Sequence, residues 1–285
     1  MLHILEHVIH HAVEDSIKIL PFLFITYLIM EYLEEKMTAK TVAVLQKTEK
    51  SGPVWGALLG MLPQCGFSAS ASNLYAGRMI TVGTLLAVYL STSDEMLPMM
   101  LSASIEPSFI VKVVLLKAGI GMAAGILVDF IWQKLLKHKK GEPDIHHFCE
   151  HEHCECGHGI VRPAIKHTLK IWFFIFLVTI ILNFVIEMVG TEALSNFILN
   201  KPIIGEILAG IIGLIPNCAA SVVITQLFLD GLIPFGTMMA GLLVGAGVGV
   251  LILLRVNEEK KDTLKIIGVL YVIGVVSGFI INLLC

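Results

Sequence analysis

Two cysteines lie in strongly apolar stretches, each directly after a proline and an amide side chain: the chain reads PQC at 63–65 and PNC at 216–218. A thiolate is a soft ligand that favours Zn²⁺, Cu(I) and, by the same logic, trivalent metalloids. Nearby amide and hydroxyl oxygens would add harder ligands, which leaves Mn²⁺ or an uncharged hydroxide species open. The alternative is that both cysteines are small buried hydrophobic residues. The residues that we expect to contact substrate here are Pro63, Gln64, Cys65, Ser68, Ser70, Asn73, Pro216, Asn217, Cys218 and Ser221, with Cys65 and Cys218 as metal ligands.

A carboxylate interrupts another apolar stretch. Residues 80–104 are apolar up to Leu90, pass through Ser-Thr-Ser-Asp-Glu at 91–95 and turn apolar again at Met96. A carboxylate inside a membrane is costly and usually functional. We therefore expect Asp94 to neutralise a bound cation or to exchange a proton. The alternative is that Asp94 caps the half-helix that restarts after it.

A polar loop in the middle of the chain combines imidazoles, thiols and carboxylates. Its metal-ligating candidates are His146, His147, Cys149, His151, His153, Cys154, Cys156 and His158. Tracts of this composition bind divalent metal ions, although the spacing does not match a structural zinc finger. We expect the loop to capture, buffer or sense metal, and we expect no obligatory cofactor. The alternative is a solvated low-complexity linker.

The composition excludes several classes of protein. The chain has 285 residues, of which 56% are hydrophobic and only 15% charged, and its mean hydropathy is +0.83. Soluble domains are about 25% charged, so the sequence predicts an integral membrane protein in a lipid bilayer. The net charge of -3 gives no reason to expect nucleic acid. The chain contains no GxxxxGK[ST] phosphate loop and no Ser/His/Asp arrangement, so we expect neither ATP hydrolysis nor another enzyme activity.

The apolar segments predict an all-α membrane fold. A span needs about 20 apolar residues. The uninterrupted spans that we predict are Ile17–Leu33, Pro107–Trp132, Ile165–Glu187 and Ile266–Leu284, and the interrupted ones are Pro53–Tyr75, 80–104, Ile203–Leu229 and Phe235–Leu254. Proline removes a backbone donor and clashes with the preceding turn. We therefore expect Pro53–Tyr75 to cross the membrane as a single span with a break at Pro63.

The two halves of the chain repeat each other. Cys218 follows Cys65 by 153 residues, and the same offset relates Pro63 to Pro216 and the Gly-Thr pair at 83–84 to that at 236–237. We expect ten transmembrane segments as two five-segment repeats with discontinuous helices. The odd number of segments inverts the second repeat. The predicted divisions are a first repeat at 1–136, a His/Cys-rich loop at 137–164 and a second repeat at 165–285. Such transporters bind substrate near the midplane between broken helices.

The basic residues predict the orientation of the chain. Lys and Arg are enriched in cytoplasmic loops, and most of them lie at 36–50, 134–170 and 255–265. We therefore expect the His/Cys loop in the cytoplasm and both termini outside it. A span across 53–75 would place Arg78 outside as well.

The chain resembles a bacterial family of ten-transmembrane-helix heavy-metal exporters, whose members are also described as arsenic efflux proteins or manganese transporters. The resemblance rests on VEDSIKILPFLFITYLIMEYLEE at 13–35, LPQCGFSASASNLYAG at 62–77, LIPNCAASVVITQLFLDG at 214–231 and the His/Cys loop, and it covers nearly the whole chain. It implies export of a metal or metalloid ion across the bacterial cytoplasmic membrane.

These observations together predict a secondary-active exporter of a metal or metalloid ion, with its site between the two broken helices. Proton coupling is a hypothesis that the embedded carboxylates motivate, and a homo-oligomer is allowed. Two alternatives stay open: a carrier for a small organic solute or anion, and a membrane metal sensor or scaffold.

Overall fold

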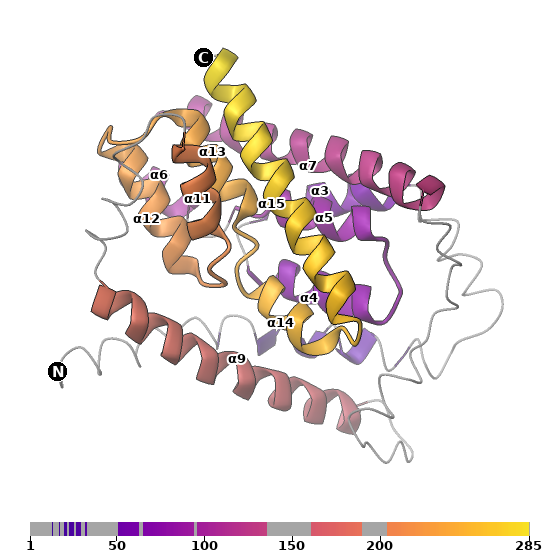
Figure 1. The fold of residues 1–285 in the computed structure, drawn as a ribbon. Coiled ribbons are helices and arrows are strands. Elements are labelled where there is room, and N and C mark those ends of the chain that lie inside the picture. Colours follow the sequence, from indigo (N-terminus) through magenta and orange to yellow (C-terminus); the bar gives the residue numbers. More distant parts are fainter. Residues whose placement is uncertain are drawn as a thin grey trace.

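The computed structural model describes residues 51–62, 65–93, 96–135, 161–189 and 204–284, together with positions 13, 17, 20, 21, 23–25, 27–29 and 32. The described residues are helical and include no strand, as the apolar composition predicts. The first-half helices are α3 (Gly52–Gly60), α4 (Cys65–Ala76), α5 (Val82–Ser91), α6 (Met96–Ser102) and α7 (Pro107–Leu135). The second-half helices are α9 (Val161–Val189), α11 (Gly205–Gly213), α12 (Cys218–Leu229), α13 (Phe235–Val244), α14 (Val248–Val256) and α15 (Lys260–Leu284). Figure 1 shows their arrangement.

Four stretches in the described part of the chain are long and apolar enough to cross a membrane: Pro107–Trp132, Val161–Ile181, Phe235–Val256 and Lys260–Leu284. The outer faces of α7 and α15 expose large apolar side chains such as Phe130, Val272 and Leu283. Large exposed apolar surfaces of this kind are rare on soluble proteins. The chain is therefore a multi-pass membrane protein with lipid against these faces.

The helix boundaries of the first half recur in the second. The helices α11, α12 and α13 begin and end 153 residues after α3, α4 and α5. A side-chain contact recurs with them: the Gly83 N–H donates to Asp129 Oδ1 at 2.8 Å, and the Gly236 N–H donates to Asn282 Oδ1 at 2.7 Å. The register seen in the sequence thus corresponds to matching helix boundaries and matching contacts.

The helices α3 and α5 run side by side in the same direction. Gly52 lies against Thr84 near the start of both helices, and Gly60 lies against Ser91 at their ends. A Cβ atom on Gly60 would lie 2.7 Å from the Val88 carbonyl oxygen, which belongs to the backbone and cannot move aside, so only glycine permits this approach. In the second half α11 lies on α13 in the same way, with Gly205 against Thr237 and Gly213 against Gly241.

The helix α4 runs back along α5 in the opposite direction. The Ser72 and Tyr89 hydroxyls are 2.7 Å apart near the end of α5, and α4 ends only a few residues before Thr81, which caps the start of α5. Therefore α3 and α4 form a hairpin, and the prediction that Pro53–Tyr75 crosses as one span is wrong. Each arm is short: the 9 residues of α3 cover about 14 Å, roughly half of the hydrocarbon core.

The two hairpins open at opposite ends of α7. Beside the first hairpin, the Thr81 hydroxyl donates to Asp129 Oδ2 at 2.6 Å, which places the start of α5 near the C-terminal end of α7. Beside the second hairpin, the ring of Phe109 stacks on Phe228 at 5.9 Å and meets Phe235 edge-on at 5.6 Å between centroids. The end of α12 and the start of α13 therefore lie near the N-terminal end of α7.

The second arm of each hairpin packs on the other half of the chain. The helix α4 contacts α14, and α12 contacts α6. The Ser72 hydroxyl donates to the Gly249 carbonyl at 2.7 Å, and a Cβ atom on Gly249 would lie 2.8 Å from Cβ of Ser68. The two halves are therefore interlocked rather than placed side by side.

The centre of the bundle is formed by α5 and α13. Every residue of α5 is buried, and α13 is buried from Gly236 onwards. The helix α9 runs along one side of the bundle (Figure 1), and the ring of its His167 stacks on the ring of Tyr27 at 5.5 Å between centroids. The Tyr27 hydroxyl donates to Asn73 Oδ1 at 2.9 Å, which ties Tyr27 to the first hairpin.

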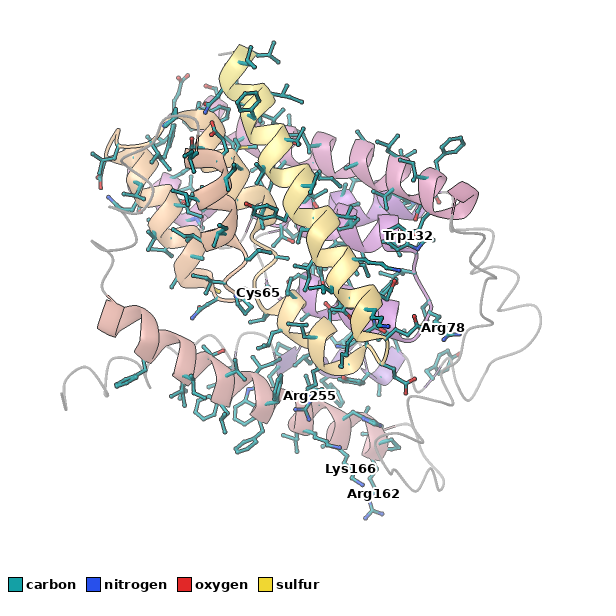
Figure 2. All side chains as sticks on the ribbon, in the orientation of Figure 1. Cys65, Arg78, Trp132, Arg162, Lys166 and Arg255 are labelled. Carbon is teal, nitrogen blue, oxygen red and sulfur yellow. The ribbon has the colours of Figure 1, made fainter. Side chains whose placement is uncertain are left out.

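One end of the molecule gathers basic side chains. Arg78, Arg162, Lys166 and Arg255 lie toward the same end in Figure 2. The Tyr75 hydroxyl donates to Asp262 Oδ2 at 2.6 Å, which joins the end of α4 to the start of α15 at this end. The prediction that Arg78 lies opposite the other basic clusters is wrong, because the hairpin returns the chain to the end from which it entered.

Candidate functional site

The two hairpin tips bring the cysteines together. The Sγ atoms of Cys65 and Cys218 are 3.5 Å apart, and neither cysteine is part of a disulfide. A disulfide has sulfur atoms about 2.05 Å apart, so the two sulfur atoms are close without being bonded. Figure 2 shows Cys65 in the middle of the molecule, between the two halves. Cys218 is buried and Cys65 is half-buried.

Both thiols stand at helix N-termini. Cys65 is the first residue of α4 and Cys218 the first residue of α12. A helix N-terminus presents unsatisfied N–H groups and the equivalent of about +0.5 charge. Two such ends facing one another favour a thiolate, an oxyanion or a neutral hydroxide with lone pairs. The chemistry of the site therefore combines soft sulfur ligands with backbone hydrogen-bond donors.

Polar residues next to each cysteine bond the backbone of the helix start. The Ser68 hydroxyl donates to the Cys65 carbonyl at 2.9 Å, and the Ser221 hydroxyl donates to the Cys218 carbonyl at 2.7 Å. Asn217 is the N-cap of α12, where its Oδ1 accepts from the Ala219 N–H at 3.3 Å. These contacts fix the first turn of each second arm and so hold the thiols in place.

The remaining predicted site residues have different positions. Asn73 is fully buried two turns along α4, where it bonds Tyr27 and donates from Nδ2 to the Ala69 carbonyl at 3.2 Å. Ser70 is half-buried on α4, and Pro216 is half-buried in the turn between α11 and α12. Pro63, Gln64, Asp94 and the His/Cys loop candidates lie outside the described residues. Among the residues that are described, no group of three or more His, Cys, Asp or Glu side chains could hold a metal.

Hydroxyl groups bond the last carbonyls of α5, where the apolar stretch at 80–104 is interrupted. The Ser91 hydroxyl donates to the Ala87 carbonyl at 2.7 Å, and the Thr92 hydroxyl donates to the Val88 carbonyl at 2.7 Å. Both side chains are buried. A break of this kind survives at membrane depth only where protein groups satisfy the backbone. Side chains of the protein therefore satisfy the backbone where α5 ends, and this point lies beside the C-terminal end of α3.

A buried lysine is the residue that the sequence interpretation missed. Lys117 lies in α7 and is 1% exposed. Its Nζ donates to the Thr92 carbonyl in the first half and to the Leu242 carbonyl in the second, the latter at 2.9 Å. A lysine deep in an otherwise apolar span marks a functional candidate by itself. That signal was present in Pro107–Trp132, where Lys117 is far from either helix end.

The comparison with protein families agrees with these features. The family described as "Putative, 10TM heavy-metal exporter" matches residues 4–195 and 177–285. Neither a curated protein nor a solved structure gave a significant match to the chain. Because the family model matches well over half of the sequence, this chain belongs to that family of ten-transmembrane-helix heavy-metal exporters.

Proposed function

We propose that the chain is a secondary-active transporter that exports a metal or metalloid ion across the bacterial cytoplasmic membrane, with Cys65 and Cys218 as ligands on its path. The supporting observation is the 3.5 Å separation of the two Sγ atoms. Two thiolates on one Zn²⁺ ion, each about 2.3 Å away, lie about 3.8 Å apart at a tetrahedral angle. A small adjustment of the hairpin tips is enough to hold a soft ion.

The proposed membrane topology has inverted repeats at 1–136 and 165–285, joined by the loop at 137–164. Each repeat has five segments: a first helix, two hairpin arms, a broken crossing element and a closing helix. Only the first helix, the broken element and the closing helix cross, and an odd number of crossings inverts the second repeat. The opening of the two hairpins at opposite ends of α7 supports this arrangement.

The proposed orientation places the basic end in the cytoplasm. Arg78 joins Arg162, Lys166 and Arg255 at that end, which strengthens the charge bias. The His/Cys loop, which connects α7 to α9, then lies in the cytoplasm, where it would bind divalent metal ahead of transport. Both termini lie on the outer side.

The proposed energy source is the proton gradient, with Asp94 as a candidate proton carrier. The chain has no nucleotide-binding loop, and a carboxylate at membrane depth is a common proton relay. Uptake of arsenite or Mn²⁺ into everted vesicles should follow an imposed pH gradient. Uptake that ignores the gradient would remove the proton from the proposal.

The experiment that tests the site is replacement of both cysteines by serine. Cells that express Cys65→Ser/Cys218→Ser should lose resistance across a panel of arsenite, Mn²⁺, Zn²⁺ and Cu⁺ for whichever ion the wild type exports. A matched control replaces the loop cysteines Cys149, Cys154 and Cys156 by serine and should retain transport. Full resistance in the Cys65→Ser/Cys218→Ser variant would refute the thiol site.

One observation favours a second candidate, a carrier for a small anion. The facing N-termini of α4 and α12 offer backbone N–H groups of the kind that bind anions. In that case the two cysteines would be packing residues and would not bind the substrate. Their replacement by serine would leave transport of an oxyanion such as arsenate unchanged.

A further inference from the structure

The Lys117 ammonium bonds the C-terminal ends of α5 and α13. Its Nζ donates to the carbonyl of Thr92, the C-cap of α5, and to the carbonyl of Leu242, in the last turn of α13. The two carbonyls are 150 residues apart in sequence and belong to different halves of the chain. The lysine itself comes from a third element, α7.

Both carbonyls are free of helical partners because of the breaks. A helical Leu242 carbonyl would accept the N–H of Ala246, but that N–H bonds the Val244 carbonyl at 2.8 Å instead. Thr92 follows the last residue of α5, so its carbonyl projects from the end of the helix. Each helix C-terminus carries the equivalent of about −0.5 charge. Two such ends therefore favour a positive charge placed between them.

Helix ends of this kind are cation sites in transporters with broken helices. Unwound carbonyls and half-helix C-termini there coordinate Na⁺ or provide the path of H⁺. We propose that Lys117 is a tethered cation that takes the place of a free monovalent cation such as Na⁺ at the ends of α5 and α13. If the proposed transport function is correct, export should be independent of Na⁺, and this consequence rests on that function. The proposal that the ammonium occupies a cation site does not depend on it.

The second half has no lysine at the position equivalent to Lys117. The residue equivalent to Lys117 is Leu270, which is fully buried in the apolar core. The two halves therefore match in backbone but differ in charge at this level of the bundle. A single lysine serves both breaks, and its removal should affect both halves at once.

The test compares thermal unfolding of the purified full-length protein in NaCl and in choline chloride at equal ionic strength. The wild type should have the same Tm in both salts, because the ammonium already fills the site. Lys117→Ala should have a lowered Tm in choline that rises saturably with NaCl, since ligand binding to the folded state raises stability. Lys117→Met, which fills the space with an apolar chain, should be destabilised equally in both salts.

Two controls make the outcome specific. Lys112→Ala removes an exposed lysine from the same helix and should show no difference between the salts. Lys117→Arg keeps the charge and should stay independent of Na⁺. A saturable Na⁺ effect on the wild type, or no Na⁺ effect on folded Lys117→Ala, would overturn the proposal. If Lys117→Ala does not fold, a saturable Na⁺ effect on the wild type would still overturn the proposal. Since no arm uses transport, the result stands apart from the test of the thiol site.

Discussion

Asp129 and Asn282 occupy equivalent positions near the ends of α7 and α15, and each accepts the backbone N–H of the second residue of a neighbouring helix. Asp129 Oδ1 accepts from Gly83 of α5, and Asn282 Oδ1 accepts from Gly236 of α13. A backbone N–H at a helix start is usually bonded by a side chain from the residues just before the helix. Here a side chain from another helix also bonds it. Because an amide does in one half what a carboxylate does in the other, this contact needs an oxygen rather than a charge.

Replacement of Asp129 should therefore distinguish hydrogen bonding from charge. Asp129→Ala removes the acceptor for Gly83 and Thr81 and should lower stability by about 1 kcal/mol, as loss of an N-cap does. Asp129→Asn should stay close to wild type. The measurement is the Tm of purified protein in detergent, with Asp230→Ala, at an exposed turn, as the control. Equal loss in Asp129→Asn and Asp129→Ala would show that the negative charge matters after all.

Oxidation should link the two hairpin tips. In a background that lacks Cys149, Cys154, Cys156 and Cys285, mild oxidation with copper phenanthroline should join Cys65 to Cys218, because the two sulfur atoms are only 3.5 Å apart. With a protease site inserted in the loop at 137–164, the cleaved halves should run together on a non-reducing gel and separate after reduction.

The control for this crosslink pairs Cys65 with a cysteine at Ser221, one turn further along α12, in place of Cys218. That pair should join more slowly, because the Ser221 side chain turns back to the Cys218 carbonyl. Halves that separate without reductant in the Cys65/Cys218 protein would contradict the meeting of the two tips.

Glycine at the contact between α11 and α13 should be indispensable. A Cβ atom on Gly213 would lie 2.3 Å from the Gly241 carbonyl oxygen, which belongs to the backbone and cannot move aside. Gly213→Ala should therefore cost about 1–3 kcal/mol through overpacking. Gly119→Ala is the matched control: nothing lies within 4 Å of a Cβ there, and alanine in a helix is favoured over glycine by about 1 kcal/mol. Thermal unfolding of both variants checks the contrast, and equal stability of the two would count against the close packing.

The hairpin topology predicts which side of the membrane reaches each turn. Arg78→Cys should react with a membrane-impermeant maleimide in everted vesicles, and Asp230→Cys should react in intact spheroplasts. Both positions are exposed in turns that follow equivalent helices, but the turns lie at opposite ends of the bundle. Labelling of both residues from one side would reject opposite hairpins.

Deletion of 143–159 separates a carrier from a sensor. A carrier that uses the loop only to gather ions should keep transport, with an increased apparent KM and an unchanged maximal rate, because the ligands at Cys65 and Cys218 remain. A sensor or scaffold should lose its metal response altogether. The measurement is initial uptake of the exported ion into everted vesicles over a range of concentrations, with a Gly/Ser loop of equal length as the control.

The breaks could be located from the sequence, but the direction of the chain after each break could not. Proline and its neighbours mark where a helix ends. Whether the next helix continues or returns depends on the helices against which it packs. Here the glycines of α3 allow that helix to pack closely on α5, and α4 then returns along α5. The match between Cys65 and Cys218 needed only the repeat, which is why their approach was predictable.

The hydroxyl residues show a second limit. The substrate contacts of Ser68 and Ser221 stay predictions, but the sequence did not show that each hydroxyl donates to a carbonyl of its own helix, which serine does readily when no water is near. The position of Lys117 in an apolar span was visible in the sequence, but two of its partners are backbone carbonyls, and only the folded backbone shows that breaks in both halves leave them available.

The exchanged packing of α4 on α14 and of α12 on α6 bears on how the molecule changes shape. Each packed pair contains one helix from either half, so helices that stay together are not neighbours in the gene. A rocking motion that preserved these pairs would carry part of each half with the other. The groups of helices that move together would then not correspond to the two halves of the sequence. Truncation at the loop would separate helices that belong to the same moving group.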